Sequence, residues 1–152
     1  MIQQIICSFV GTIAFSIMFN VSRRFYVYCG LTGVAGWVTY CLLVSHISPA
    51  LATFFGTIIV VLLSRIFAVW RKCPITVFLI SGILPLVPGT YVYYTAYHFV
   101  RDNLGMAVDK GIMALKLAFA IVLGIVFIVS IPRQFFSVQY WKDRRKKNKV
   151  VT

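Results

Sequence analysis

The apolar segment at residues 75–100 constrains this chain most, because it is long enough to cross a bilayer yet contains two helix breakers. It has no charged residue, and its middle reads Leu-Pro-Leu-Val-Pro-Gly over residues 84–89. Pro85 and Pro88 each lack an N–H, and each ring clashes with the carbonyl four residues earlier, so we expect the helix to break there. Inside a bilayer such a break is tolerated only where it faces protein or a wet cavity.

The composition places this segment in a protein that crosses the membrane several times. Of the 152 residues 61% are hydrophobic, glutamate is absent, and the acids are only Asp102, Asp109 and Asp143, a balance not expected of a soluble domain. At roughly 20 residues per span, four or five helices fit. We therefore predict an all-α fold with one transmembrane domain over residues 1–139, about five spans at residues 2–20, 28–47, 50–70, 75–100 and 112–131, and a basic cytoplasmic tail at residues 140–152.

The basic residues predict how these spans are oriented. Five spans put the loops on alternating sides, so that 11 Lys and Arg residues fall on one side and 3 on the other. Basic loops concentrate on the cytoplasmic side of membrane proteins. We therefore expect a multi-pass protein of the cell membrane with its N-terminus outside and its C-terminus in the cytoplasm. This placement accounts for the net charge of +12, and we expect no nucleic-acid partner.

The sequence shows no pattern typical of catalysis or of metal binding. His46 and His98 lie in different regions and the acids lie outside the predicted spans, so no serine, histidine and acid triad can be assembled. No glycine-rich nucleotide loop and no metal-ligand spacing occurs, and the four cysteines form no CxxC pair. We therefore expect a protein that is not an enzyme and that carries no metal and no cofactor.

Polar side chains follow the break. Thr90 and Tyr91 come directly after it, near the expected middle of the membrane, and Tyr94 and Thr95 lie about one turn further along. A helix that starts inside the membrane directs its positive N-terminal end at the break, where adjacent hydroxyls would suit a carboxylate. Many transporters build their substrate sites from discontinuous helices of this kind. The alternative is a kink that serves only helix packing.

Two further polar residues are candidates for the same pathway. Arg65, near the end of its predicted span, either snorkels to the interface or balances an anionic substrate. Asn20 continues a row of small or polar residues (Ser8, Thr12, Ser16) that serves helix packing or a polar pathway. The predicted pathway residues, of which the prolines and the glycine shape the site, are Pro85, Pro88, Gly89, Thr90, Tyr91, Tyr94, Thr95, Arg65 and Asn20.

Several short motifs, in order along most of the chain, match one known family. They are Phe19-Asn20-Val21, Cys29-Gly30, Ser64-Arg65, Pro74, the run from Ile83 to Gly89, and the following Tyr91, Tyr94 and Thr95. With these motifs the chain resembles the threonine/serine exporter family, most closely the small subunit of its two-component systems, one of which is described as a dicarboxylate (succinate) exporter. In such systems a larger membrane subunit carries a soluble region and the remaining spans, so the resemblance implies a larger partner.

The break and the resemblance together predict one function and leave one alternative. We expect a subunit of a secondary exporter that moves a small carboxylate-bearing metabolite outward, either threonine or serine or a dicarboxylate such as succinate. Because the sequence has no nucleotide site, we expect coupling to the proton gradient. The polar groups within the spans are too few for a complete pathway, which favours a larger partner subunit or a homo-oligomer in the lipid bilayer. In the alternative, the chain is a structural subunit that stabilises a larger partner without contacting substrate.

Overall fold

The computed structural model describes residues 2–130, and every regular element within this range is helical, as predicted. Two short 3₁₀ turns, η1 (Arg23–Phe25) and η2 (Leu84–Leu86), accompany the α-helices. The predicted basic tail, residues 140–152, lies outside the described residues. The α-helices are α1 (Ile2–Met18), α2 (Tyr26–Val44), α3 (Pro49–Arg71), α4 (Thr76–Ile83), α5 (Gly89–Val100) and α6 (Leu104–Val129).

Three helical segments are long and apolar enough to cross a membrane, namely η1 with α2, then α3, then α6. The pair formed by α4 with η2 and by α5 qualifies as a fourth span, with a bend of 49° between its halves. α1 is apolar but has 17 residues, which is the lower end of the usual length of a span. The broken helix is thus confirmed, and about five spans were predicted where the described residues hold three or four of full length.

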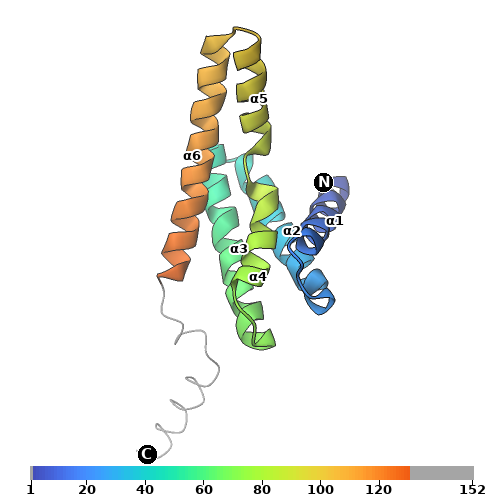
Figure 1. Ribbon diagram of the computed structural model, residues 1–152. Helices are drawn as coiled ribbons and strands as arrows, with labels where there is room; N and C mark the ends of the chain where they lie inside the picture. The colour runs from blue at the N-terminus through green and yellow to red at the C-terminus, as the bar shows by residue number, and fades with distance from the viewer. Residues whose placement is uncertain (1, 131–152) are drawn as a thin grey trace, which may run out of the picture.

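The last helix begins earlier than the sequence suggested. α6 starts at Leu104, whereas a loop was predicted over residues 101–111. The turn is short because Asp102 adopts the left-handed conformation, with φ of 56°. Asn103 then caps α6, its side chain accepting a hydrogen bond from the Met106 N–H at 3.4 Å. As a result α5 and α6 form a tight hairpin whose two helices lie side by side (Figure 1).

Small residues bring α1, α2 and α3 into close contact. On α2, Gly33 lies against the side chain of Thr12 on α1, and Gly36 lies against Val60 on α3. A Cβ atom at either glycine would collide with these side chains. Since helices in a bilayer approach closely where small residues meet, the glycine face of α2 serves to hold it between its two neighbours.

Phe78 fixes the beginning of α4 in this bundle. Its side chain is fully buried and meets the rings of Phe25, Tyr28 and Phe67 at centroid distances of 5.6, 6.3 and 5.9 Å. All three contacts are edge-to-face, an arrangement that aromatic pairs favour. α4 is therefore anchored against α2 and α3.

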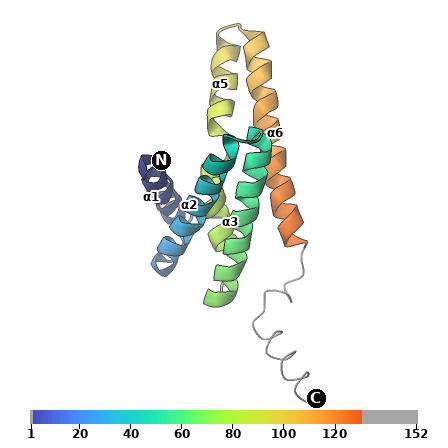
Figure 2. The same cartoon turned by 180° about the vertical axis from the view of Figure 1, so that it is seen from behind.

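α6 is shared between two parts of the molecule. Its second half meets α3, where Gly124 lies against the side chain of Thr57, and its first half meets α5, where Gly111 lies against Thr95. Figures 1 and 2 show the consequence: the α5–α6 hairpin extends beyond the group formed by α1 to α4. None of the α5 residues is buried within the chain. The break thus separates a half-helix packed inside the bundle from one that packs chiefly on α6.

Candidate functional site

The break at Pro85 and Pro88 is a short non-helical connection between two half-helices. After α4, η2 ends with the Val87 N–H donating to the Leu84 carbonyl at 3.1 Å. Val87 is extended, with φ of −61° and ψ of 131°, and Pro88 has φ of −77° and ψ of 48°. α5 then begins at Gly89. The two prolines end the helical hydrogen-bond ladder because neither can donate to it.

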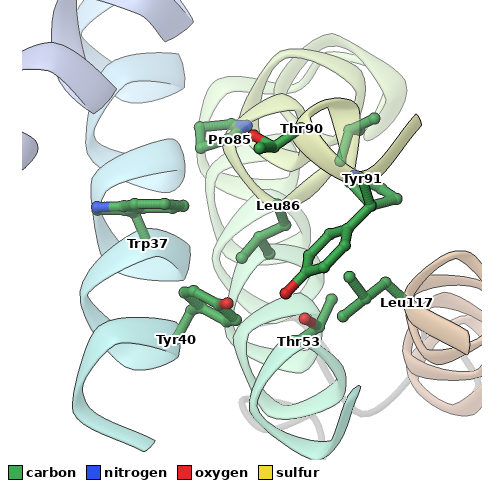
Figure 3. A pocket seen from close by; sticks show the side chains of 10 residues that line it. Trp37, Tyr40, Thr53, Pro85, Leu86, Thr90, Tyr91 and Leu117 are labelled. Atoms are coloured by element: carbon green, nitrogen blue, oxygen red, sulfur yellow. The ribbon is translucent and has the colours of Figure 1, made fainter. Parts of the chain in front are cut away.

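A cavity of about 130 Å³ lies at this break. Four of the predicted residues line it, namely Pro85, Pro88, Thr90 and Tyr91. Other helices contribute the rest of the wall, as Figure 3 shows for most of these side chains. The volume is below the roughly 300–1,000 Å³ of pockets that hold drug-sized ligands, so the cavity suits a small metabolite. The remaining lining residues are Trp37, Tyr40, Thr53, Leu86, Val87 and Leu117.

Hydroxyl groups from three different helices meet in this cavity. The ring of Tyr91 reaches across it, and its hydroxyl lies near the side chains of Tyr40 and Thr53 (Figure 3). The Thr53 hydroxyl donates to the Pro49 carbonyl at 2.8 Å, so its oxygen remains available as an acceptor. The lining includes no charged side chain, and no group of three or more His, Cys, Asp or Glu in residues 2–130 could hold a metal ion. The cavity offers polar, uncharged recognition.

The first turn of α5 adds one backbone donor at the break. The N–H of Gly89 donates to the Val87 carbonyl at 2.8 Å, and those of Tyr91 and Val92 both donate to the Pro88 carbonyl at 3.1 Å. This leaves the N–H of Thr90 without a partner among the described residues. Free N–H groups and the helix dipole make a helix N-terminus attractive to an anion. A carboxylate at the break would meet this end of α5 with the hydroxyls opposite.

Leu86 holds the break against the bundle. It is 6% exposed and enters a notch formed by two glycines, Gly36 on α2 and Gly56 on α3. A Cβ at Gly56 would lie 3.3 Å from one Leu86 methyl and 3.0 Å from the Gly36 carbonyl oxygen. The close approach of α2 and α3 therefore shapes the floor of the cavity, because Leu86 lines it from this notch.

Three predicted residues on α5 lie next to the cavity without lining it. Gly89 has an ordinary negative φ, and a Cβ there would meet nothing within 4 Å, so neither backbone strain nor close contact requires glycine. Tyr94 lies in an exposed row with Tyr93, which it meets edge-on at 5.5 Å. Thr95 donates to the Tyr91 carbonyl at 2.7 Å and faces α6 at Gly111.

Arg65 and Asn20 lie away from the break. Arg65 is 7% exposed and donates from Nη2 to the Val129 carbonyl at 2.9 Å. It thus reaches the C-terminal end of α6, where the helix dipole favours a cation, whereas the break cavity touches the middle of α6 at Leu117. Asn20 follows α1 in the left-handed conformation, with φ of 54°, and lines a different cavity. The structure does not bring these two residues to the break.

The sequence did not reveal the residues that α2, α3 and α6 supply. Trp37 and Tyr40 are a turn apart on α2, and Thr53 begins the second turn of α3. Within an apolar span, one tyrosine or threonine looks like any other. The ring of Trp37 faces the cavity while its indole nitrogen points away (Figure 3), and that Nε1 is buried without a hydrogen-bond partner.

Comparison with known proteins identifies the family of the chain. A family model described as Threonine/Serine exporter, ThrE, matches residues 4–131, which covers most of the chain and all of the cavity. No curated protein and no solved structure matches. The matching family is one of membrane transporters and not of enzymes, which agrees with the helical membrane fold. The chain therefore belongs to the threonine/serine exporter family.

Proposed function

We propose that this chain is a subunit of a secondary exporter that moves a small carboxylate-bearing metabolite out of the cell, threonine or serine or a dicarboxylate such as succinate. The observation that carries the proposal is the break cavity: the N-terminus of α5 lies at it, four hydroxyl-bearing side chains line it, and its lining carries no acid. A carboxylate would accept hydrogen bonds from the Thr90 N–H and from the hydroxyls of Thr90, Tyr91 and Tyr40. Membership of an exporter family supports the direction of transport.

A larger membrane subunit is the partner that we infer. α5 has no residue buried within the chain, and its outward side carries exposed Val92, Tyr93, Tyr97 and Phe99. One wall of the break cavity is built from this weakly covered helix. A subunit that covered α5 would complete the wall. The proton gradient is the proposed energy source, and the distribution of the basic loops supports a cytoplasmic C-terminus.

An efflux assay with Tyr91→Phe tests the site. Cells that express the exporter are loaded with a threonine-containing dipeptide or with succinate, and the metabolite is followed as it appears outside. Losing one hydrogen bond to a charged group costs about 1.5–3 kcal/mol of binding free energy. The internal substrate concentration at half-maximal efflux should therefore rise at least about tenfold. Thr90→Val should weaken export in the same direction.

Tyr93→Phe is the matched control, because Tyr93 is 64% exposed on the outward side of α5. It removes a tyrosine hydroxyl from the same helix but keeps the aromatic ring that a partner subunit would cover, so it should leave efflux unchanged. Efflux that is equally insensitive to Tyr91→Phe and Thr90→Val would contradict the site.

The alternative function is a structural subunit that contacts no substrate, and the exposed face of α5 favours it as a docking surface. Accessibility separates the two functions. A cysteine at Thr90 should react with a water-soluble thiol reagent if the break cavity belongs to a wet pathway. It should stay unreactive in the assembled complex if α5 only docks a partner.

A further inference from the structure

A second cavity, of about 480 Å³, lies at the other end of α4 from the break. It opens between the turn after α1, the start of η1 and the first turns of α4. Polar side chains in its wall are Asn20, Ser22, Thr76 and Ser81, set among apolar ones. A cavity with a few polar groups in an apolar lining is typical of a site for a small molecule. We call this cavity the basal vestibule.

Four basic residues lie within two positions of lining residues of the basal vestibule in the chain. The Arg24 Nε donates to the hydroxyl of Ser22 at 3.4 Å, so a guanidinium touches a lining residue directly. Arg23 is beside it on η1, and Arg71 and Lys72 precede the lining residue Cys73. The two acids of the described residues lie on the α5–α6 hairpin, Asp102 in its connecting turn and Asp109 in the second turn of α6. A cleft lined by charge of one sign concentrates ions of the opposite sign.

The basal vestibule and the break cavity flank the same short helix. Ser81 lines the first cavity, and Pro85, one turn later, lines the second. Phe78 anchors α4 between them. A solute that moved along α4 from the basic end would therefore reach the hydroxyls at the break.

Asn20 presents its side chain here because of its backbone. It occupies the left-handed region, with φ of 54°, which asparagine tolerates better than most residues. Its N–H donates to the Ile17 carbonyl at 3.0 Å and closes the turn after α1. The exposed carboxamide lies in the vestibule wall and offers an N–H₂ donor group to a carboxylate.

We propose that the basal vestibule is a second binding site, which takes a small carboxylate-bearing anion at the basic, cytoplasmic end before the anion passes along α4 to the break. The basic residues next to the vestibule draw the anion in, and the Asn20 carboxamide together with the Ser22 hydroxyl orients its carboxylate. This site rests on the proposed export function and adds to it an intake point that lies apart from the break.

Native Cys73 reports on the occupancy of this site, because it lines the vestibule and is partly exposed. The full chain carrying Cys7→Ser and Cys41→Ser is placed in inside-out membrane vesicles and treated with a membrane-impermeant maleimide. Cys29 is fully buried and stays silent. Succinate or threonine should slow the labelling of Cys73 in a saturable manner, whereas chloride at equal ionic strength should not.

Two variants make this protection specific. Asn20→Gly removes the carboxamide but keeps the left-handed turn, and it should raise the succinate concentration for half-protection about tenfold. Arg24→Gln should raise it in the same direction. Arg101→Gln, at the tip of the α5–α6 hairpin, is the control and should leave protection unchanged. Protection that is absent, or reproduced by chloride, or insensitive to both test variants would overturn the proposal.

The outcome can be separated from that of the export function. Efflux that depends on Tyr91 while Cys73 shows no protection would reject the vestibule alone. Saturable protection of Cys73 in a protein whose efflux ignores Tyr91→Phe would support the vestibule and reject the break as the substrate site.

Discussion

Replacing Gly36 with alanine tests whether the contact between α2 and α3 holds the break in place. A Cβ at this position would overlap the Cγ2 methyl of Val60, approach a Leu86 methyl to 3.4 Å and lie 3.6 Å from the Gly56 carbonyl oxygen. Val60 is fully buried. Because a β-branched side chain in a helix has one strongly preferred rotamer, Val60 cannot turn aside, and α2 must move away from α3.

The expected loss of stability follows from two opposing effects. Inserting a methyl group into a filled interior costs about 1–3 kcal/mol. Because the Val60 side chain is rigid, we expect a cost of about 2–3 kcal/mol at this site. Alanine also favours the helix over glycine by about 1 kcal/mol. The net destabilisation is therefore about 1–2 kcal/mol. Gly11→Ala is the matched control: a Cβ on Gly11, inside α1, meets nothing within 4 Å, so that variant should gain up to about 1 kcal/mol.

Unfolding of the purified full-length chain in detergent micelles, followed by circular dichroism, measures this difference. The two glycine variants should differ by about 2–3 kcal/mol in the free energy of unfolding. A double variant, Gly36→Ala with Val60→Ala, makes room for the added methyl. It should be less destabilised than the sum of its single variants.

The reasoning would be refuted by equal stabilities of Gly36→Ala and Gly11→Ala. It would also be refuted by a double variant whose loss equals the sum of the single losses, because Val60 would then not be the obstacle.

Three further predictions concern single side chains. Burial raises the pKa of the Cys73 thiol, and the thiolate is the reactive form, so maleimide labelling of Cys73 should be slow at neutral pH and should become faster as the pH rises; a rate that does not change with pH would contradict this. Arg65→Leu removes the guanidinium that donates to the Val129 carbonyl and should destabilise the protein by about 1.5–3 kcal/mol in thermal unfolding; a variant as stable as the parent would show that this contact contributes nothing. Asn20→Ala should be less stable than Asn20→Gly by about 1 kcal/mol, because alanine is strained at the left-handed φ of 54°; the reverse order would mean that the turn relaxes.

The break was predictable because its cause is local. Pro85 and Pro88 lack the N–H groups that a helix needs, and each ring clashes with the carbonyl four residues earlier, so the helix is bound to kink or break there. The helical fold was predictable for a similar reason, since a backbone in lipid must satisfy its own hydrogen bonds. By contrast, the tight turn before Leu104 depended on the left-handed Asp102 and the Asn103 cap, a signal that a hydropathy pattern does not contain.

The candidate site was only partly predictable. Thr90 and Tyr91 line the cavity as expected, because they directly follow the break in the chain. Tyr94 was expected there too, but it lies about one helical turn beyond Tyr91 and belongs to the exposed row of α5. Tyr40 and Thr53 were missed because their contribution depends on how α2 and α3 are placed beside the break.

By itself, the sequence determined that the chain is helical, that it carries a break after Leu84 and that no acid lies in the apolar segment around it. These properties follow from single residues and their immediate neighbours. Only the tertiary structure decided which hydroxyls face one another across the cavity, and that Arg65 meets the end of α6. Those outcomes depend on how far one helix slides and turns against the next. That register is set by close contacts such as Leu86 in its notch of two glycines, where each helix fits only against the others.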